Sequence, residues 1–419
     1  MPSEAELVRS LDDEPDTPST VDIRRAIATA ERHRKVRRRA GYAGAAAITA
    51  VAVAGGSVAG NLGSGEPQPR VAATAKASTA AKASTAAKPA YTIPGTAGWD
   101  VAAAPAPTSC KLERLTAPAG APMALVSGAD PAGRYIVGRS YPKSGGYQAV
   151  IWDNGKGREV KLPGDIEESL TDVNGSGTAV GWSYQGSAPV PYAYRDGKVT
   201  KLGGARHGSA YAINEAGAIL GDDDAGHVLV WPSVDAKPTR LPVPSGTERA
   251  QARDLDEDGT VVGSLDLERP YVWFGDGTHR QLPMPSVDGK PVPVAQAFNI
   301  RNGWVTGMAS SGSLKSPAHK DMKIWAVTWN LRTGETKIVD EVPSPVDAVN
   351  AHGWQVGTDA GGYAVMVTDS GTVRLPDLAK HRTDGTSTIA STISDDGRVV
   401  AGQSDDETDT IQAIVWRCT

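Results

Sequence analysis

Phenylalanine and cysteine are almost absent from this chain of 419 residues, with two of each. Two cysteines are too few for a disulfide-dense domain or a zinc cluster. Positive charge is not in excess either, because 43 Lys and Arg stand against 48 Asp and Glu. This balance argues against a nucleic-acid binder, which collects basic residues on one surface. What is abundant is 47 Gly, 29 Pro and 10 Trp, typical of an all-β fold with short strands and tight turns.

Local catalytic motifs are also missing. The sequence contains no His-Glu-x-x-His, no Gly-x-Ser-x-Gly and no Gly-x-x-x-x-Gly-Lys. The histidines have no metal-ligand spacing, and we interpret them as surface or turn residues. We therefore expect no enzyme built on a local motif and no organic cofactor, although carboxylates gathered from distant segments leave catalysis open.

An uncharged stretch begins at Ala40, directly after six basic residues between Arg32 and Arg39. We predict a transmembrane helix over residues 40–63, long enough to cross a hydrocarbon core of about 30 Å. The preceding positive charge places the N-terminus in the cytoplasm and the rest of the chain outside the cell membrane. Two alternatives remain: a signal peptide cleaved near Ser57-Val58-Ala59, which would make the protein secreted, and a buried Ala-rich helix.

The segments on either side of this span have contrasting compositions. Residues 1–39 show helix-capping spacing and predict a cytoplasmic helical arm, which resembles the cytoplasmic tails of actinobacterial membrane proteins, some of which hold sigma factors. A solvated tail that only orients the anchor is the alternative. Residues 64–108 are rich in Ala, Lys, Ser, Thr and Pro and predict a disordered linker.

Residues 109–419 repeat one unit seven times, which predicts a seven-bladed β-propeller. A glycine marks each copy at intervals of 40 to 50 residues: Gly138, Gly181, Gly221, Gly263, Gly307, Gly357 and Gly402. An aromatic residue follows in six copies, at Trp152, Tyr194, Trp231, Trp273, Trp329 and Trp416, with Val367 as the exception. Each unit reads as a four-stranded meander whose second strand ends at the glycine.

Three further features recur within the unit. Asn or Asp opens the turn after the first strand in five copies: Asp130, Asn174, Asn214, Asp256 and Asn350. The third strand carries the aromatic residue, and the fourth carries a leucine, at Leu162, Leu202, Leu241, Leu282 and Leu375. We expect the aromatic residues and leucines to pack between blades, because no single blade can bury them.

The seventh unit stops at Trp416 without a fourth strand. The segment Lys111–Leu115 has the pattern of that strand, so the N-terminal strand is predicted to close the ring by pairing with the last blade. Cys110 and Cys418 fall where other blades turn between strands three and four, and export favours oxidation, so we predict a disulfide between them. Two unrelated thiols are the alternative.

The repeats resemble the bacterial extracellular HAF repeat. The resemblance lies in Leu202-Gly-Gly followed by Ser209-Ala-Tyr-Ala-Ile-Asn214, and in Gln148-Ala-Val-Ile-Trp152, and it extends over residues 123–417. The literal His-Ala-Phe triplet is absent, its nearest forms being Tyr192-Ala-Tyr194 and Gln412-Ala-Ile414. The resemblance implies an exported β-propeller of unsettled biochemical role.

One segment approaches a metal-binding pattern. Asp254, Asp256 and Asp258 alternate before Gly259, as oxygen ligands do in a calcium loop. The loop is incomplete, because Val262 and Leu265 occupy the positions where acidic ligands would be needed. The alternative is an ordinary turn of blade four.

Ligands of propellers usually contact the loops between strands two and three and between blades, because these surround the central axis. The candidate ligand face therefore includes two acidic loops and a long loop of blade five: Asp222, Asp223, Asp224, Asp405, Asp406, Glu407, Lys315, His319, Lys320 and Lys323. Solvated loops are the alternative.

These observations favour a cell-surface, non-catalytic binding or sensing propeller. Its expected partner is an extracellular protein, glycan or cell-wall component. Two alternatives remain: a propeller hydrolase or lyase acting on envelope glycans, and a membrane regulator acting through the cytoplasmic arm.

Overall fold

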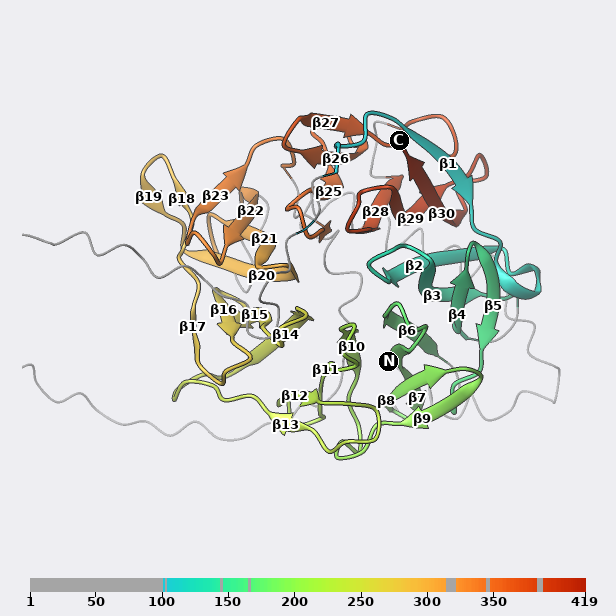
Figure 1. Cartoon of the computed structure of the whole chain (residues 1–419), viewed down its shortest axis with the longest axis horizontal. Coiled ribbons are helices and arrows are strands. Elements are labelled where there is room, and N and C mark those ends of the chain that lie inside the picture. Colours follow the sequence, from blue (N-terminus) through green and yellow to red (C-terminus); the bar gives the residue numbers. More distant parts are fainter. Residues whose placement is uncertain are drawn as a thin grey trace, which may run out of the picture.

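The computed structural model describes residues 101, 104–143, 146–164, 167–313, 322–343, 347–382 and 387–419. In these residues, seven four-stranded antiparallel sheets form a ring around a central axis, so the chain is an all-β seven-bladed propeller as predicted (Figure 1). The predicted cytoplasmic arm, transmembrane span and linker, residues 1–39, 40–63 and 64–108, fall almost wholly outside the described residues. Within the described part of the chain, no helix has the length and hydropathy needed to cross a membrane.

Each blade is a meander whose first strand lies at the inner edge of the ring and whose fourth lies at the rim (Figure 1). Blade one contains β2 (Met123–Ala129), β3 (Tyr135–Tyr141), β4 (Gln148–Asp153) and β5 (Lys156–Val160). Blade two contains β6 (Glu168–Val173), β7 (Ala179–Gln185), β8 (Ala188–Arg195) and β9 (Lys198–Lys201). Blade three contains β10 (Ala210–Ile213), β11 (Ile219–Asp222), β12 (Val228–Trp231) and β13 (Thr239–Arg240).

The remaining blades follow the same order. Blade four contains β14 (Ala250–Leu255), β15 (Val261–Leu265), β16 (Arg269–Trp273) and β17 (His279–Gln281). Blade five contains β20 (Val294–Arg301), β21 (Trp304–Ser310), β22 (Ile324–Asn330) and β23 (Thr336–Val339). Blade six contains β24 (Ala348–Val349), β25 (Gln355–Thr358), β26 (Ala364–Thr368) and β27 (Gly371–Arg374). Blade seven contains β28 (Thr388–Ile393), β29 (Val399–Asp405), β30 (Ile411–Cys418) and, from the N-terminal side, β1 (Cys110–Arg114). A small hairpin of β18 (Ser286–Val287) and β19 (Lys290–Pro291) follows blade four in the chain and lies beside β23 at the rim of blade five, and η1 (Pro118–Gly120) follows β1.

The repeated glycine lies opposite an irregularity in the first strand. In six blades the register of strands one and two shifts by one residue beside the glycine, as between Ala297 and Asn299 opposite Gly307. A Cβ on Gly307 would lie 1.9 Å from the carbonyl oxygen of Gln296, so a side chain is excluded there. The predicted end of the second strand at this glycine is wrong, because β3, β7, β15, β21 and β29 continue past it.

The aromatic residues join neighbouring blades as predicted, and their indole nitrogens add a hydrogen bond. Trp273 is 2% exposed, and its Nε1 donates to the carbonyl oxygen of Pro242 at 2.7 Å, directly after the fourth strand of blade three. The corresponding bonds run from Trp231 to Gly203, from Trp329 to Pro283 and from Trp416 to Pro376. A buried indole N–H needs such an acceptor, so each tryptophan fixes the distance between two blades.

The ring closes as predicted. Strand β1 pairs antiparallel with β30, with Cys110 opposite Cys418, and the two cysteines form a disulfide across 308 residues. Trp152 of blade one donates to the carbonyl oxygen of Thr116 at 2.9 Å, as other tryptophans do to the blade before them. The segment after β1 therefore serves as the end of blade seven's fourth strand.

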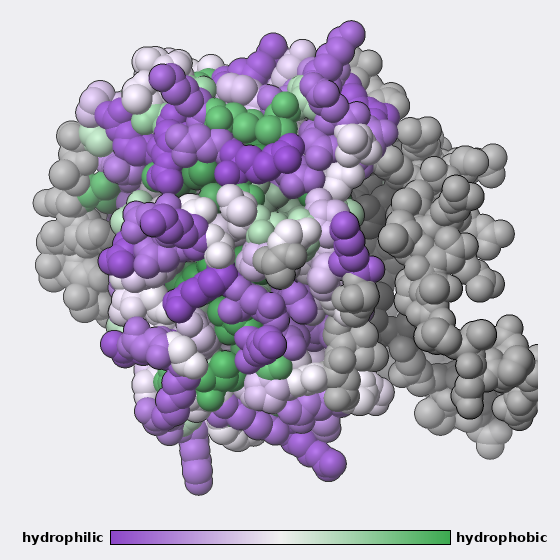
Figure 2. Space-filling view, turned by 90° about the vertical axis from the view of Figure 1, so that its right-hand side faces the viewer, coloured by the Kyte–Doolittle hydropathy of each residue, from purple (hydrophilic) through white to green (hydrophobic). Residues whose placement is uncertain are grey.

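The outer wall of the ring carries little apolar surface. Figure 2 shows one side of the molecule, on which hydrophilic residues dominate and apolar residues appear in small separate patches. Among the described residues, Val243 is the one large hydrophobic residue that is exposed, at 37%. A partner of the described domain would therefore meet mainly polar surface.

Candidate functional site

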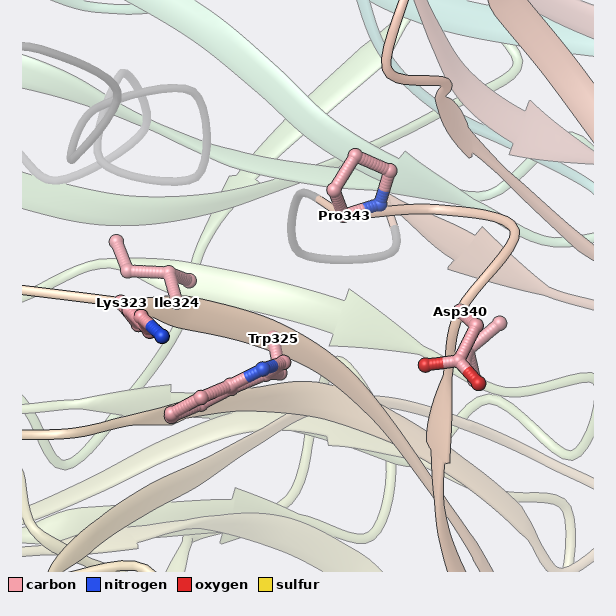
Figure 3. A pocket seen from close by; sticks show the side chains of 6 residues that line it. Lys323, Ile324, Trp325, Asp340 and Pro343 are labelled. Carbon is pink, nitrogen blue, oxygen red and sulfur yellow. The ribbon is translucent and has the colours of Figure 1, made fainter. Parts of the chain in front are cut away.

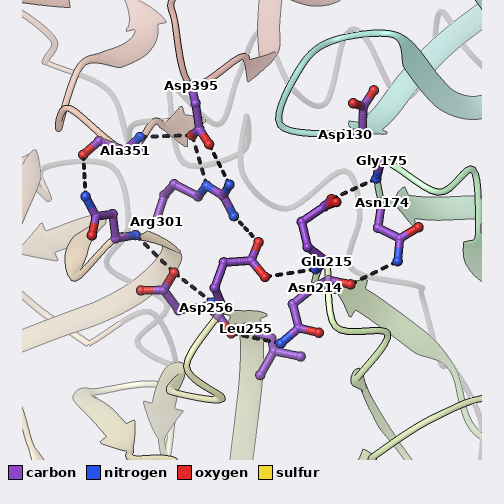
Figure 4. A network of polar contacts seen from close by, with 12 residues as sticks. Asp130, Asn174, Gly175, Asn214, Glu215, Leu255, Asp256, Arg301, Ala351 and Asp395 are labelled. Carbon is purple, nitrogen blue, oxygen red and sulfur yellow. Dashed lines mark hydrogen bonds and ion pairs between the residues drawn. The ribbon is translucent and has the colours of Figure 1, made fainter. Parts of the chain in front are cut away.

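One face of the ring, formed by the turns between strands one and two, is tied together by hydrogen bonds between neighbouring blades (Figure 4). Asn174 Nδ2 donates to the carbonyl oxygen of Asn214 at 3.0 Å, and Asn214 Nδ2 donates to that of Asp256 at 3.2 Å. Asn302 and Asn350 continue the series into blades six and seven. The Asn and Asp residues that open these turns thus form a chain of bonds around the axis, which we call the turn ring.

Arg301 crosses this face and joins three blades (Figure 4). Its guanidinium pairs with Glu257 of blade four and with Asp395 of blade seven, where Nη2 lies 2.5 Å from Oδ2. Burial alone would lower the pKa of Arg301, but the hydrogen bond and charge of Asp395, together with Glu257, raise it above its ordinary value. Both carboxylates therefore engage the Arg301 guanidinium in a structural contact between blades four, five and seven.

The three aspartates predicted as a calcium site accept hydrogen bonds from backbone N–H groups. Within the described residues, no group of three or more His, Cys, Asp or Glu side chains is placed to hold a metal ion. Asp254 Oδ2 accepts the backbone N–H of Ile300 at 2.8 Å, and Asp256 Oδ2 accepts that of Gly303 at 2.8 Å. Asp258 Oδ1 accepts the N–H of Thr260. Their oxygens accept hydrogen bonds from backbone N–H groups of the same turn and of blade five. The three aspartates therefore stabilise the turn of blade four and its contact with blade five.

Three carboxyl groups near the inner edge are biased towards the neutral form. Burial raises the pKa of Asp254 to about 6, against the opposing hydrogen bonds from Ile300 and Leu255. Burial also raises the pKa of Asp172 well above its ordinary value, although Ile213 N–H bonds to it. Asp347, immediately before β24, has its pKa raised to about 7 by burial. Asp172 and Asp254 are tied to backbone donors, which leaves Asp347 as the carboxyl suited to proton transfer.

The predicted acidic loops lie on the opposite face, between strands two and three. Two of their six carboxylates close their own hairpins: Asp223 Oδ1 accepts N–H groups of Ala225 and His227, and Asp406 Oδ1 accepts those of Thr408 and Thr410. Asp222 accepts bonds from Ser209 N–H and from the Tyr211 hydroxyl. Asp224 and Glu407 are exposed. The acidic sequences therefore reflect turn chemistry in part, and only part of their charge faces solvent.

A cavity of about 260 Å³ opens on this face of blade seven. It includes the predicted residues Asp405, Asp406 and Glu407, and its remaining lining residues are Asp377, Ala379, Lys380, Arg382, Ser387 and Asp409. The Asp377 side chain is only 7% exposed, and its Oδ1 has no hydrogen-bond partner among the residues that the structure describes. A buried carboxylate oxygen without a donor costs free energy in the folded state, so this atom is the strongest sign of a ligand contact in the cavity.

His381 holds Asp377 in place. Its Nδ1 lies 2.7 Å from Asp377 Oδ2, and its Nε2 lies 3.0 Å from the carbonyl oxygen of Gly361. The imidazole stacks on Tyr363, with 3.4 Å between ring centroids, and the Arg374 guanidinium lies over the other side of Tyr363 at 3.7 Å. His381, packed against Tyr363 of blade six, thus fixes Oδ2 of Asp377 and thereby the orientation of the whole carboxylate, including Oδ1.

A second cavity, of about 280 Å³, opens on the same face of blade five. Figure 3 shows Trp325 with Lys323 on one side and Asp340 on the other, and the remaining lining residues are Ile324, Val339 and Pro343. The half-buried indole offers an apolar face between one cation and one anion. Of the predicted residues in this loop, Lys323 lines the cavity, whereas Lys315, His319 and Lys320 lie outside the described residues.

Sequence reasoning missed Asp377, His381 and Trp325. The spacing of four residues between Asp377 and His381, in a connection between blades, was the one local signal for that pair. The free oxygen of Asp377 carries no signal in sequence, because it depends on which donors surround it in the folded chain.

No family model and no curated protein sequence matches this chain. Among solved structures, the β-propeller domain of the Trilobed protease from Pyrococcus furiosus, described as having an open velcro topology, is similar at 10% identity and a TM-score of 0.48. The match covers 70% of this chain and 95% of that one. An oligogalacturonate lyase in complex with manganese is similar at 10% identity and a TM-score of 0.43, covering 74% and 98%. Neither likeness bears on what this chain binds.

Proposed function

We propose that this protein is an exported binding module, and that its ligand face is the strand two to three side of blades five to seven. The observation that carries the proposal is the buried, unpartnered Oδ1 of Asp377 in the blade-seven cavity. Five carboxylates and two basic side chains line that cavity, so the fitting ligand group is a cation with N–H donors, such as a lysine ammonium group of an extracellular protein.

Export is part of the same proposal. The Cys110–Cys418 disulfide supports an oxidising compartment, and the uncharged stretch after the basic run supports a membrane anchor. The extracellular HAF-repeat resemblance agrees with this placement. Protease added to intact cells should remove the propeller while leaving a short N-terminal fragment; complete protection of the propeller would contradict export.

The binding proposal is tested with a fluorescent hexalysine peptide and the full-length protein. Asp377→Asn should weaken binding at least tenfold in fluorescence anisotropy, because the amide presents a weaker acceptor and no charge. Asp369→Asn is the matched control: it removes one exposed charge from the strand three to four turn, away from the cavity. Equal affinities for the two variants would show that the peptide responds to net charge and would refute the role of Asp377.

A hydrolase or lyase is the second candidate function, favoured by Asp347. This carboxyl lies beside the inner strand of blade six, is partly exposed, and has a pKa raised by burial to about 7, which suits a general acid or base near neutral pH. Turnover in a screen of glycans and esters, lost in Asp347→Asn, would establish this function. Turnover that survives the substitution would remove Asp347 from it.

A further inference from the structure

The inner edge of blades three to five contains a cation, Arg253, that has no counterion within the described part of the chain. Arg253 lies on β14, the innermost strand of blade four, at the residue where the register between β14 and β15 shifts. Its Nη2 donates to Gln251 Oε1 at 3.4 Å, and its buried Nε has no hydrogen-bond partner among the described residues. Among the ion pairs of the described residues none involves Arg253, whereas Arg301 in the next blade has two.

The surroundings of Arg253 are aromatic and low in polarity. Its guanidinium lies 5.7 Å from the ring centroid of Phe298 on β20, the innermost strand of blade five. Tyr211 on β10 of blade three is close enough to influence it electrostatically, but its hydroxyl already donates to Asp222. Burial lowers the pKa of Arg253, and Arg249, the nearest other cation that acts on it, lowers it further.

A buried guanidinium without a carboxylate is costly, and structural arginines are normally paired. Arg253 is also partly exposed at the inner edge of the ring, so a ligand can reach it. The unpartnered Nε and the weakly engaged Nη2 form one edge of the guanidinium group, which matches two oxygens of an oxyanion. Phe298 excludes water beside this edge and so strengthens a charge contact.

We infer that Arg253 is the anchor of an anion-binding site at the inner edge of the propeller, and that its ligand carries a carboxylate, phosphate or sulfate group held by two guanidinium N–H donors. This site is separate from the Asp377 cavity: it selects the opposite charge and lies at a different blade.

The test measures binding of sodium acetate, phosphate and sulfate to the full-length protein by calorimetry, at constant ionic strength with chloride as the reference. At least one probe should bind saturably to the wild type. Arg253→Gln should weaken that binding at least 30-fold, about 2 kcal/mol at 1.4 kcal/mol per tenfold. Arg253→Lys should retain part of it. Preference for acetate over the tetrahedral anions identifies a carboxylate ligand, and the reverse identifies a phosphate or sulfate ester.

The matched control is Arg158→Gln, since Arg158 is an exposed arginine that also lies over an aromatic ring, 5.4 Å from Tyr194, on an outer strand. It should leave anion binding unchanged. A second readout separates a ligand site from a structural role: without anion, Arg253→Gln should melt at a higher temperature than the wild type, because the unpaired charge is removed. A lower melting temperature, a failure to fold, or anion binding equal to that of the wild type would each overturn the inference.

Discussion

Removing the disulfide that closes the ring should lower stability by a calculable amount. The bond links residues separated by 308 positions, and the chain-entropy relation gives about 5.7 kcal/mol at 25 °C as an upper bound for a loop of this length. An unfolding entropy of about 2.1 cal/mol/K per residue over that loop corresponds to about 0.65 kcal/mol/K. The double variant Cys110→Ser/Cys418→Ser should therefore melt up to about 9 °C below the wild type.

The assay is differential scanning calorimetry of both proteins with and without a reducing agent. Reduction should lower the melting temperature of the wild type and leave the double variant unchanged, which serves as the control. The double variant should still fold, because β1 keeps its five register pairs with β30. A difference below about 1 °C, or mass mapping that finds both thiols free in exported protein, would refute the reasoning, since the denatured chain would then not be constrained by the bond.

Three further predictions concern single residues. Trp273→Phe removes the indole N–H that donates to the Pro242 carbonyl, and urea unfolding should show a loss of about 1 kcal/mol or more, the net worth of one hydrogen bond; a loss below about 0.5 kcal/mol would show that the indole bond is dispensable. Gly307→Ala drives a Cβ against the Gln296 carbonyl and should prevent folding or cost more than about 3 kcal/mol, whereas Gly312→Ala, with open space around it, should be neutral in the same measurement. Asp347 has a higher pKa in the folded than in the unfolded state, so its stabilising contribution is lost as pH rises from about 4 through about 7. The free energy of unfolding of Asp347→Asn should therefore equal that of the wild type near pH 3.5 and exceed it by up to about 4 kcal/mol at pH 8. A difference in unfolding free energy that stays constant across this pH range would contradict the assigned pKa.

The propeller fold could be predicted from the repeated unit because the residues that define each blade lie close together in the sequence. Asn214 and Gly217 define a turn, Gly221 excludes a side chain and Trp231 requires a neighbour, and each requirement can be recognised within about 20 residues. The closure was predictable for the same reason, since a missing strand and a spare strand both appear in sequence order. The error at the second strand arose because a glycine that accommodates an irregularity in its partner strand looks the same in sequence as a glycine that ends a strand.

The sites were less predictable because they depend on contacts between distant residues. Arg301 and Asp395 are 94 residues apart in sequence, and they meet across blade six. The alternating aspartates of blade four resembled metal ligands until the structure placed backbone N–H groups of blade five against them. Asp377 Oδ1 and Arg253 Nε stand out because they are buried and have no hydrogen-bond partner among the described residues. The sequence does not show which polar atoms will be left without a partner after folding.

The pairing of Cys110 with Cys418 also determines how the domain bears mechanical load. In an antiparallel pair, the N-terminal end of β1 and the C-terminal end of β30 lie side by side, so a pull at that end would open the strands one hydrogen bond at a time. The disulfide sits at this end of the strand pair. Tension entering through the residues before Thr108 therefore passes into a covalent bond, and the hydrogen bonds between β1 and β30 remain unloaded while that bond is intact.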